Sequence, residues 1–193
     1  MRMPVGLANM YWTADCKYLT GMNMEFQWHE NKLFSGKRIF GPDFFLIRVA
    51  IDPVGKPPPH IKPLEAWQFE PALPHPKYPI EFYPRTAWVG PDNPKTKYPP
   101  PALWGVRGTM DPQTRRPYRT GCNISPLDAN RPESVVESDF PRDYGDAKCV
   151  GGIPVVNGKS SVSVRVEIPA TGMPHIDRIY NAVSEFITPL VLE

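Results

Sequence analysis

The sequence predicts a mainly β protein, with a sandwich or barrel-like sheet, one C-terminal amphipathic helix and a long proline-rich extended arm. Segments with strand periodicity dominate, and one segment near the C-terminus has helical spacing. Fifteen of the 26 prolines lie between Pro53 and Pro101. Because proline fixes φ and donates no backbone hydrogen bond, neither a helix interior nor a central strand can run through such density. We therefore expect one β-rich domain built from residues 1–52 and 102–193, with residues 53–101 forming an extended arm or ordered loop.

Two strands are expected in the first fifty residues. Apolar and polar side chains alternate from Met22 to His29, which predicts a strand with one buried face. The segment Phe44 to Ile51 is aromatic and β-branched apart from Arg48, which predicts a more buried strand. Weaker strand patterns occur at residues 5–12, 64–70, 80–83, 86–89 and 102–107.

A β-hairpin is predicted near the C-terminus. Ile153–Val156 and Ser160–Ile168 flank Asn157-Gly158, a dipeptide that favours the two positive φ angles of a type I′ turn. The second strand alternates cleanly between valine or isoleucine and polar residues. Pro154 predicts that the first strand lies at a sheet edge or beside a bulge.

One helix follows the hairpin. Apolar residues from Ile176 to Leu190 recur at helical spacing and leave a polar opposite face. Pro174 suits the first helical turn, and the charge of Asp177 complements the helix dipole there. Pro189 marks the end of the helix.

The proline-rich segment is expected to be ordered. Disordered proline-rich chains are poor in aromatic residues, whereas this one contains seven, from Trp67 to Tyr98, and Trp104 follows. Prolines also lose less conformational entropy on ordering. Two other interpretations remain: a proline-stiffened loop on the protein's own surface, and P-x-x-P ligands for SH3- or WW-type modules, as at Pro71 and Pro74.

The charge distribution favours pairing between segments over nucleic-acid binding. The net charge is +2, but residues 85–119 hold seven basic and two acidic residues, and residues 128–146 hold six acidic and two basic ones. These blocks of +5 and −4 can pair within the fold or between subunits, or they can be solvated loops. Arginines near Trp104 and Tyr118 would suit a single-stranded nucleic acid. The acidic block makes that partner unlikely.

No pattern points to a cofactor or metal. The histidines His29, His60, His75 and His175 lack the paired spacing of a zinc site. Three scattered cysteines, Cys16, Cys122 and Cys149, do not resemble a disulfide framework and suit a reducing compartment. Cys149 before two glycines is the only candidate nucleophile, although a small buried side chain is the commoner role of a lone cysteine. Nearby carboxylates in residues 133–146 do not by themselves indicate acid–base chemistry.

Location is only loosely constrained by the sequence. The first residues lack the apolar core of a signal peptide, and no apolar run is long enough to span a membrane. A cytoplasmic or particle-associated protein is therefore expected.

These features favour a structural or assembly subunit over an enzyme. The arm would contact other protein subunits in a homo- or hetero-oligomer, as in a virus or bacteriophage particle. The expected contact residues are Trp67, Tyr78, Tyr83, Trp88, Tyr98, Trp104, Arg115 and Arg116. One alternative is a small hydrolase-like enzyme with a dispersed site around His29, His175 or Cys149. Another is a stand-alone binding or inhibitory protein that docks a partner at the strand edge near Pro154.

Overall fold

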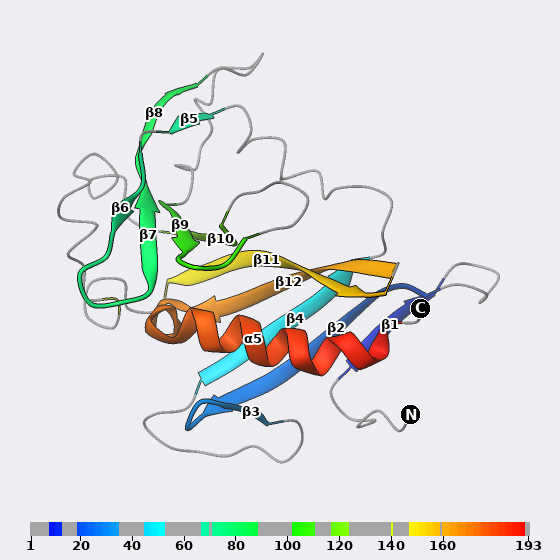
Figure 1. Ribbon diagram of the computed structural model, residues 1–193. Helices are drawn as coiled ribbons and strands as arrows, with labels where there is room; N and C mark the ends of the chain where they lie inside the picture. The colour runs from blue at the N-terminus through cyan, green and yellow to red at the C-terminus, as the bar shows by residue number, and fades with distance from the viewer. Residues whose placement is uncertain are drawn as a thin grey trace.

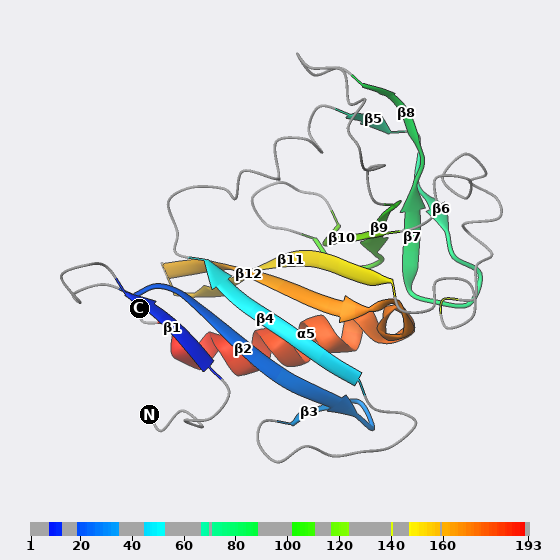
Figure 2. The ribbon, with the colours of Figure 1, turned by 180° about the vertical axis from the view of Figure 1, so that it is seen from behind.

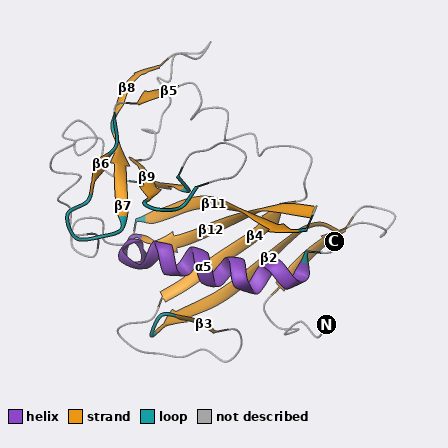
Figure 3. Ribbon diagram, viewed as in Figure 1, coloured by secondary structure: helices purple, strands orange, loops and turns teal. Residues whose placement is uncertain are grey.

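The computed structural model describes residues 8–12, 19–34, 45–52, 67–69, 71–88, 102–110, 117–123, 140, 147–158 and 160–191. These residues form one open antiparallel sheet with a helix across one face (Figures 1 and 3). The sheet has the strand order β1-β2-β4-β12-β11-β10-β9-β7-β6, and β3 pairs with β2 beside β1. Its strands are β1 (Ala8–Trp12), β2 (Leu19–His29), β3 (Lys32–Phe34), β4 (Phe45–Asp52), β6 (Leu73–Pro74), β7 (Ile80–Tyr83), β9 (Ala102–Val106), β10 (Arg119–Cys122), β11 (Lys148–Asn157) and β12 (Ser160–Pro169).

The alternation in the sequence places a continuous apolar surface under the helix. Met22, Met24, Phe26 and Trp28 of β2 are all buried, as predicted. Helix α5 (Ile176–Ile187) runs across this face in front of the sheet in Figure 1 and behind it in Figure 2. Its own buried residues are Ile176, Ile179, Tyr180, Val183 and Ile187. The predicted amphipathic helix is thus confirmed, and it closes the core.

Short 3₁₀ turns flank α5 and contain the two prolines that bracket it. Pro174 lies in η1 (Ala170–His175), before the α-helix begins, whereas the sequence predicted it in the first turn of the α-helix. Pro189 lies in η2 (Thr188–Leu190), directly after the α-helix ends. Proline thus marks both ends of the α-helix because it cannot supply an interior backbone donor.

One register row crosses nine of the ten strands, all except β3, on the helix-facing side. It runs Ala8, Met24, Val49, Val166, Gly151, Thr120, Trp104, Phe82 and Leu73. Large apolar side chains on either side give way in the middle to the small pair Gly151 and Thr120. A methyl group on Gly151 would lie 1.8 Å from the Tyr180 hydroxyl oxygen, so the glycine makes room for the helix to insert this side chain.

The opposite face of the sheet carries paired charges. Arg48 Nε lies 3.0 Å from Glu25 on one neighbouring strand, and Arg48 Nη1 lies 3.3 Å from Glu167 on the other. Lys148 extends the row with a contact of 3.0 Å to Glu167. These neighbours, Glu25 first, raise the pKa of Arg48 above its ordinary value. Opposite charges on adjacent strands fix the register and keep this face polar.

The β11–β12 hairpin differs from the predicted turn chemistry. Asn157 pairs with Ser160 and does not have a positive φ, so the β11–β12 turn begins at Gly158, where φ is 58°. The hairpin is confirmed, but the expected use of Asn157-Gly158 as its central pair was wrong. The β2–β3 turn instead has two positive φ angles, 47° at Glu30 and 62° at Asn31, as a type I′ turn requires.

The mainly β class with one C-terminal helix is confirmed, whereas a sandwich or closed barrel is not seen in the described residues. β1 and β6 form the two edges of an open sheet. Strands β6 and β7 come from the proline-rich segment and join the same sheet as β9–β12. β7 contains no proline and lies between Pro79 and Pro84, and β6 is the edge strand, as proline requires. The division into a domain and an arm stays a prediction.

Candidate interaction site

The proline-rich segment also forms a two-stranded ribbon. β5 (Trp67–Phe69) pairs with β8 (Arg85–Trp88), which follows β7 after a single residue, Pro84. The ribbon stands apart from the strands that α5 covers, at the top of Figures 1 and 2. Trp67 and Trp88 are register partners in it. The backbone thus places the two tryptophans side by side at one end of the ribbon.

A tight turn connects β6 to β7 and is built around His75. The His75 ring is buried, with 2% of its surface exposed, and stacks on Tyr78 at a centroid distance of 4.6 Å. Its Nδ1 accepts hydrogen bonds from the backbone N–H groups of Lys77 and Tyr78, at 3.1 and 3.2 Å. Nδ1 therefore carries no proton in this arrangement. The imidazole takes the place of a backbone acceptor in a segment whose prolines limit backbone pairing.

Arg107 also holds this turn, through hydrogen bonds to its carbonyl groups. Its Nη2 donates to the carbonyl oxygens of His75 and Tyr78, at 3.2 and 2.6 Å. Its backbone N–H donates to the carbonyl of Pro79 at 2.9 Å. These bonds satisfy three carbonyls of the turn, so the turn is ordered by side chains of its own chain.

Tyr83 lies across the sheet surface on the side opposite α5. Its hydroxyl donates to Glu81 at 2.6 Å, and the Arg119 guanidinium lies 5.1 Å from its ring centroid. A methyl group on Gly105 would come within 2.6 Å of the ring, so the glycine allows Tyr83 to lie flat. Tyr83 is half-buried by these contacts. It presents one ring face to its own sheet and keeps part of its surface for another contact.

The other predicted contact residues differ in their burial, and some of them lie outside the described residues. Trp104 is fully buried against Phe82 and Phe140 in the core, so its ring offers no surface to a partner. Tyr78 is half-buried against His75. Tyr98, Arg115 and Arg116 lie outside the described residues. Among the predicted residues that the structure describes, Trp67, Trp88, Tyr78 and Tyr83 remain as contact candidates.

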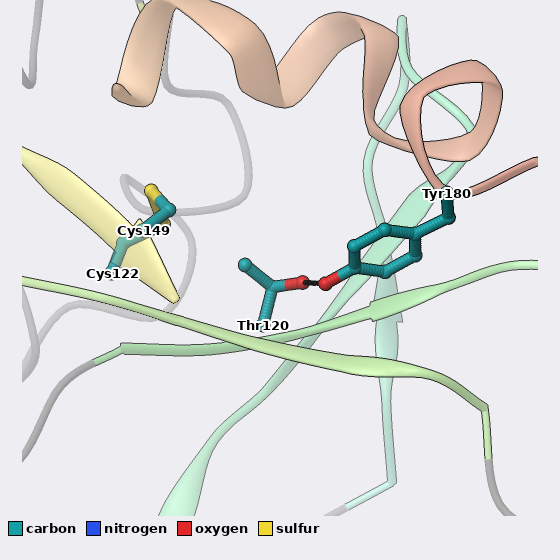
Figure 4. The surroundings of a disulfide bond; sticks show 4 residues. All are labelled: Thr120, Cys122, Cys149 and Tyr180. Carbon is teal, nitrogen blue, oxygen red and sulfur yellow. Dashed lines mark hydrogen bonds between the residues drawn. A yellow bond between two sulfur atoms is a disulfide. The ribbon is translucent and has the colours of Figure 1, made fainter. Parts of the chain in front are cut away.

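The cysteine prediction was wrong. Cys122 of β10 and Cys149 of β11 are direct cross-strand partners and form a disulfide (Figure 4). Both are fully buried, so Cys149 is not a free nucleophile. The pairing escaped the sequence argument because it depends on the register of two strands whose cysteines are 27 residues apart. Spacing alone does not reveal such a register.

His175 is another of the residues proposed for a dispersed catalytic site. His175 lies at the start of α5, and partial burial, together with the charge of Arg178, lowers its pKa below the ordinary value of histidine. Asp177 opposes that shift weakly. Within the described part of the chain, no group of three or more histidine, cysteine, aspartate or glutamate residues could hold a metal ion.

β11 lies inside the sheet between β12 and β10, and its register with β12 is regular through Pro154, so the predicted position of Pro154 at a sheet edge or bulge was wrong; Pro154 instead lies beyond the residues of β11 that pair with β10. β11 pairs along its full length with β12, but β10 covers only Cys149 to Gly151 among the described residues. Since Asn157–Ser160 closes the hairpin as a hydrogen-bonded pair, alternation makes Pro154–Ser163 a pair whose backbone nitrogens point outward. Proline at this position removes the donor that an added strand would need, and so it blunts the edge.

Two residues that hold the β6–β7 turn were not identified from the sequence. His75 and Arg107 organise the β6–β7 turn, and the only available signal was a histidine between two prolines in an aromatic segment.

No known protein family, curated protein or solved structure is significantly similar to this chain. The described helices include none of the length and apolarity needed to cross a membrane.

Proposed function

We propose that this protein is an assembly subunit that contacts other protein subunits through the ribbon formed by β5 and β8. The observation that carries the proposal is the ribbon itself, a two-stranded element that continues β7 beyond the main sheet. An isolated two-stranded ribbon is only marginally stable in water. A surface on a neighbouring subunit would stabilise it and cover the paired positions Trp67 and Trp88.

Rigidity supports this role. The ribbon is joined through Pro84 to the end of β7, and the opposite end of β7 is held by the β6–β7 turn with His75 and Arg107. Because β7 is already fixed in the sheet, association has to order only the ribbon itself, which limits the entropy lost on binding. Tryptophan and tyrosine are also the side chains that most often dominate interface energies. A virus or bacteriophage particle is the kind of assembly in which we place such a subunit.

The hydrolase-like and stand-alone binding roles have weaker support. The candidate nucleophile Cys149 is in a disulfide. The free edge of β11 has Pro154 where an added strand would need a donor. Neither feature gives a positive observation comparable to the ribbon.

Size-exclusion chromatography with light scattering, over a wide range of protein concentrations, tests the proposal. We expect a mass above the 21.8 kDa of one chain, falling to that value in the double variant Trp67→Ala/Trp88→Ala. Met110→Ala is the matched control, since Met110 is 56% exposed in the β9–β10 connection and its loss should not change association. A strictly monomeric wild-type protein, both isolated and in its native extract, would overturn the proposal. Unchanged association of the double variant would exclude the ribbon as the contact.

A further inference from the structure

The junction between β10 and β11 is a short ladder inside the sheet, with three residue pairs. β11 pairs with β12 from Lys148–Pro169 to Asn157–Ser160, and β2 pairs with β4 from Met22 to Trp28. Among the described residues, in contrast, β10 pairs with β11 from Thr120 to Cys122. Every strand beyond this point, namely β10, β9, β7 and β6, reaches the rest of the sheet through this short ladder.

Two side-chain links reinforce the short ladder. The hydroxyl groups of Thr120 and Tyr180 are hydrogen-bonded, which joins β10 to α5 over the gap at Gly151 (Figure 4). The disulfide between Cys122 and Cys149 joins β10 to β11 directly. Among the described residues it is the one covalent bond across the junction, and it occupies one of the paired positions of the ladder.

We propose that this disulfide is a redox-sensitive cross-link that keeps β10, β9, β7 and β6 attached to the strands covered by α5. In the oxidised protein the bond keeps the junction closed. Reduction by a dithiol breaks the S–S bond by thiolate attack, through a mixed disulfide. The two electrons and two protons come from the dithiol, which becomes a disulfide, and the protein gains two thiols. The junction then depends on the three residue pairs, the Asn123 N–H to Lys148 carbonyl bond, the Thr120–Tyr180 hydrogen bond, the Tyr118–Tyr180 ring contact and packing in the shared apolar core.

The strands covered by α5 do not need this bond. β2, β4, β12 and β11 are joined by long ladders, and α5 packs on their shared apolar face. Reduction should therefore loosen the β10 side and leave this part folded. Since both cysteines are fully buried, a reductant reaches them only when the junction opens. The closed form belongs to an oxidising environment, in contrast to the reducing compartment that the cysteine count suggested.

Hydrogen–deuterium exchange of the full chain, with and without a dithiol such as dithiothreitol, tests this inference. Cys16→Ser is the background in which to work, because Cys16 is outside the disulfide and could otherwise form bonds between chains. We expect amides of β9 and β10 to exchange on the order of a hundredfold faster after reduction, as the loop-closure model for a disulfide predicts. Amides of β2, β4 and β12 should keep their protection.

Several outcomes would overturn the inference. Equal acceleration in every strand would mean that the disulfide stabilises the whole fold, and no change would mean that the junction does not depend on it. Free thiols at Cys122 and Cys149 in air-oxidised protein, detected by alkylation and mass spectrometry, would remove its basis. The variant Cys122→Ala/Cys149→Ala should reproduce the reduced pattern, and its failure to fold at all would contradict the independence of the α5-covered strands. None of these results depends on whether the ribbon binds a partner.

Discussion

The helix-covered strands, β2, β4, β12 and β11, and the proline-rich side, β6, β7, β9 and β10, share one antiparallel sheet but are stabilised in different ways. The helix-covered strands pair over long ladders, and their apolar face packs against α5. On the proline-rich side the ladders are short, and β6 pairs with β7 only at Leu73 and Pro74. There, the His75 side chain accepts hydrogen bonds from backbone N–H groups, and the Arg107 side chain donates hydrogen bonds to backbone carbonyls.

The difference follows from the chemistry of proline. Each proline removes a backbone donor, so a proline-rich segment cannot complete a regular ladder. Its remaining N–H and C=O groups still need partners when they leave water, and side chains provide them. Order in the helix-covered strands therefore depends on periodicity, whereas order in the proline-rich turn depends on a few individual side chains.

The largest expected effect lies at the junction between the two regions. In Gly151→Ala the new methyl group would lie 1.8 Å from the Tyr180 hydroxyl and 2.7 Å from the Arg119 carbonyl oxygen. The Thr120–Tyr180 hydrogen bond must then break or the strands must shift, which we expect to cost about 3 kcal/mol or more of unfolding free energy. Urea denaturation measures this loss.

The adjacent glycine is the matched control. In Gly152→Ala the nearest atom to the new methyl group is the Val164 carbonyl oxygen at 3.7 Å, an ordinary contact. We expect an effect between neutral and about 1 kcal/mol of stabilisation. Similar losses in the two variants would show that α5 does not require the space at Gly151.

His75→Phe tests the role of single side chains on the proline-rich side. Phenylalanine keeps an aromatic ring beside Tyr78 but leaves the N–H groups of Lys77 and Tyr78 without their acceptor. We expect the free energy of unfolding to fall by about 1–3 kcal/mol. Amide exchange should become faster at Lys77 and Tyr78 and should not change in β2 or β4. In His75→Asn the side-chain oxygen can accept similar bonds, so the two amides should stay protected even if the lost ring lowers stability. Equal exchange in both variants would mean that the imidazole nitrogen does not order the turn.

The smallest expected effect concerns His175 at the start of α5, on the helix-covered side. Its pKa is lowered in the folded protein by partial burial and by Arg178, so folding favours the neutral ring. Its contribution to stability is complete above the unfolded pKa of about 6.5 and is lost as the pH falls below that value. The difference in melting temperature between wild type and His175→Gln should therefore change slightly from pH 7 to pH 5, in favour of the variant at the lower pH. A pH-independent difference would contradict the lowered pKa.

The helix-covered strands show what periodicity can predict. Alternation located β2 and identified Met22, Met24, Phe26 and Trp28 as its buried face; composition located β4, a turn dipeptide with alternation located the β11–β12 hairpin, and helical spacing located α5. These elements are local in origin, because side-chain direction follows the backbone period of two or 3.6 residues. The weak strand patterns at residues 80–83 and 102–107 were also confirmed as β7 and β9.

The candidate site was less predictable, because its geometry depends on contacts between distant segments. Sequence reasoning singled out Trp67 and Trp88, but only strand pairing made them neighbours in the ribbon. It treated Trp104 as a surface residue, whereas the β7–β9–β10 register turns this side chain toward the core. It overlooked His75, whose role depends on a buried ring and two backbone donors that no residue pattern announces.

By itself, the sequence determined the mainly β character and the amphipathic helix, because these follow from the chemistry of neighbouring residues. Only the tertiary structure decided the order of the strands, the pairing of Cys122 with Cys149 and the insertion of Tyr180 beside Gly151. The physical reason is that each of these depends on register. A shift of one residue between two strands would reverse which side chains face α5 and would separate both pairs.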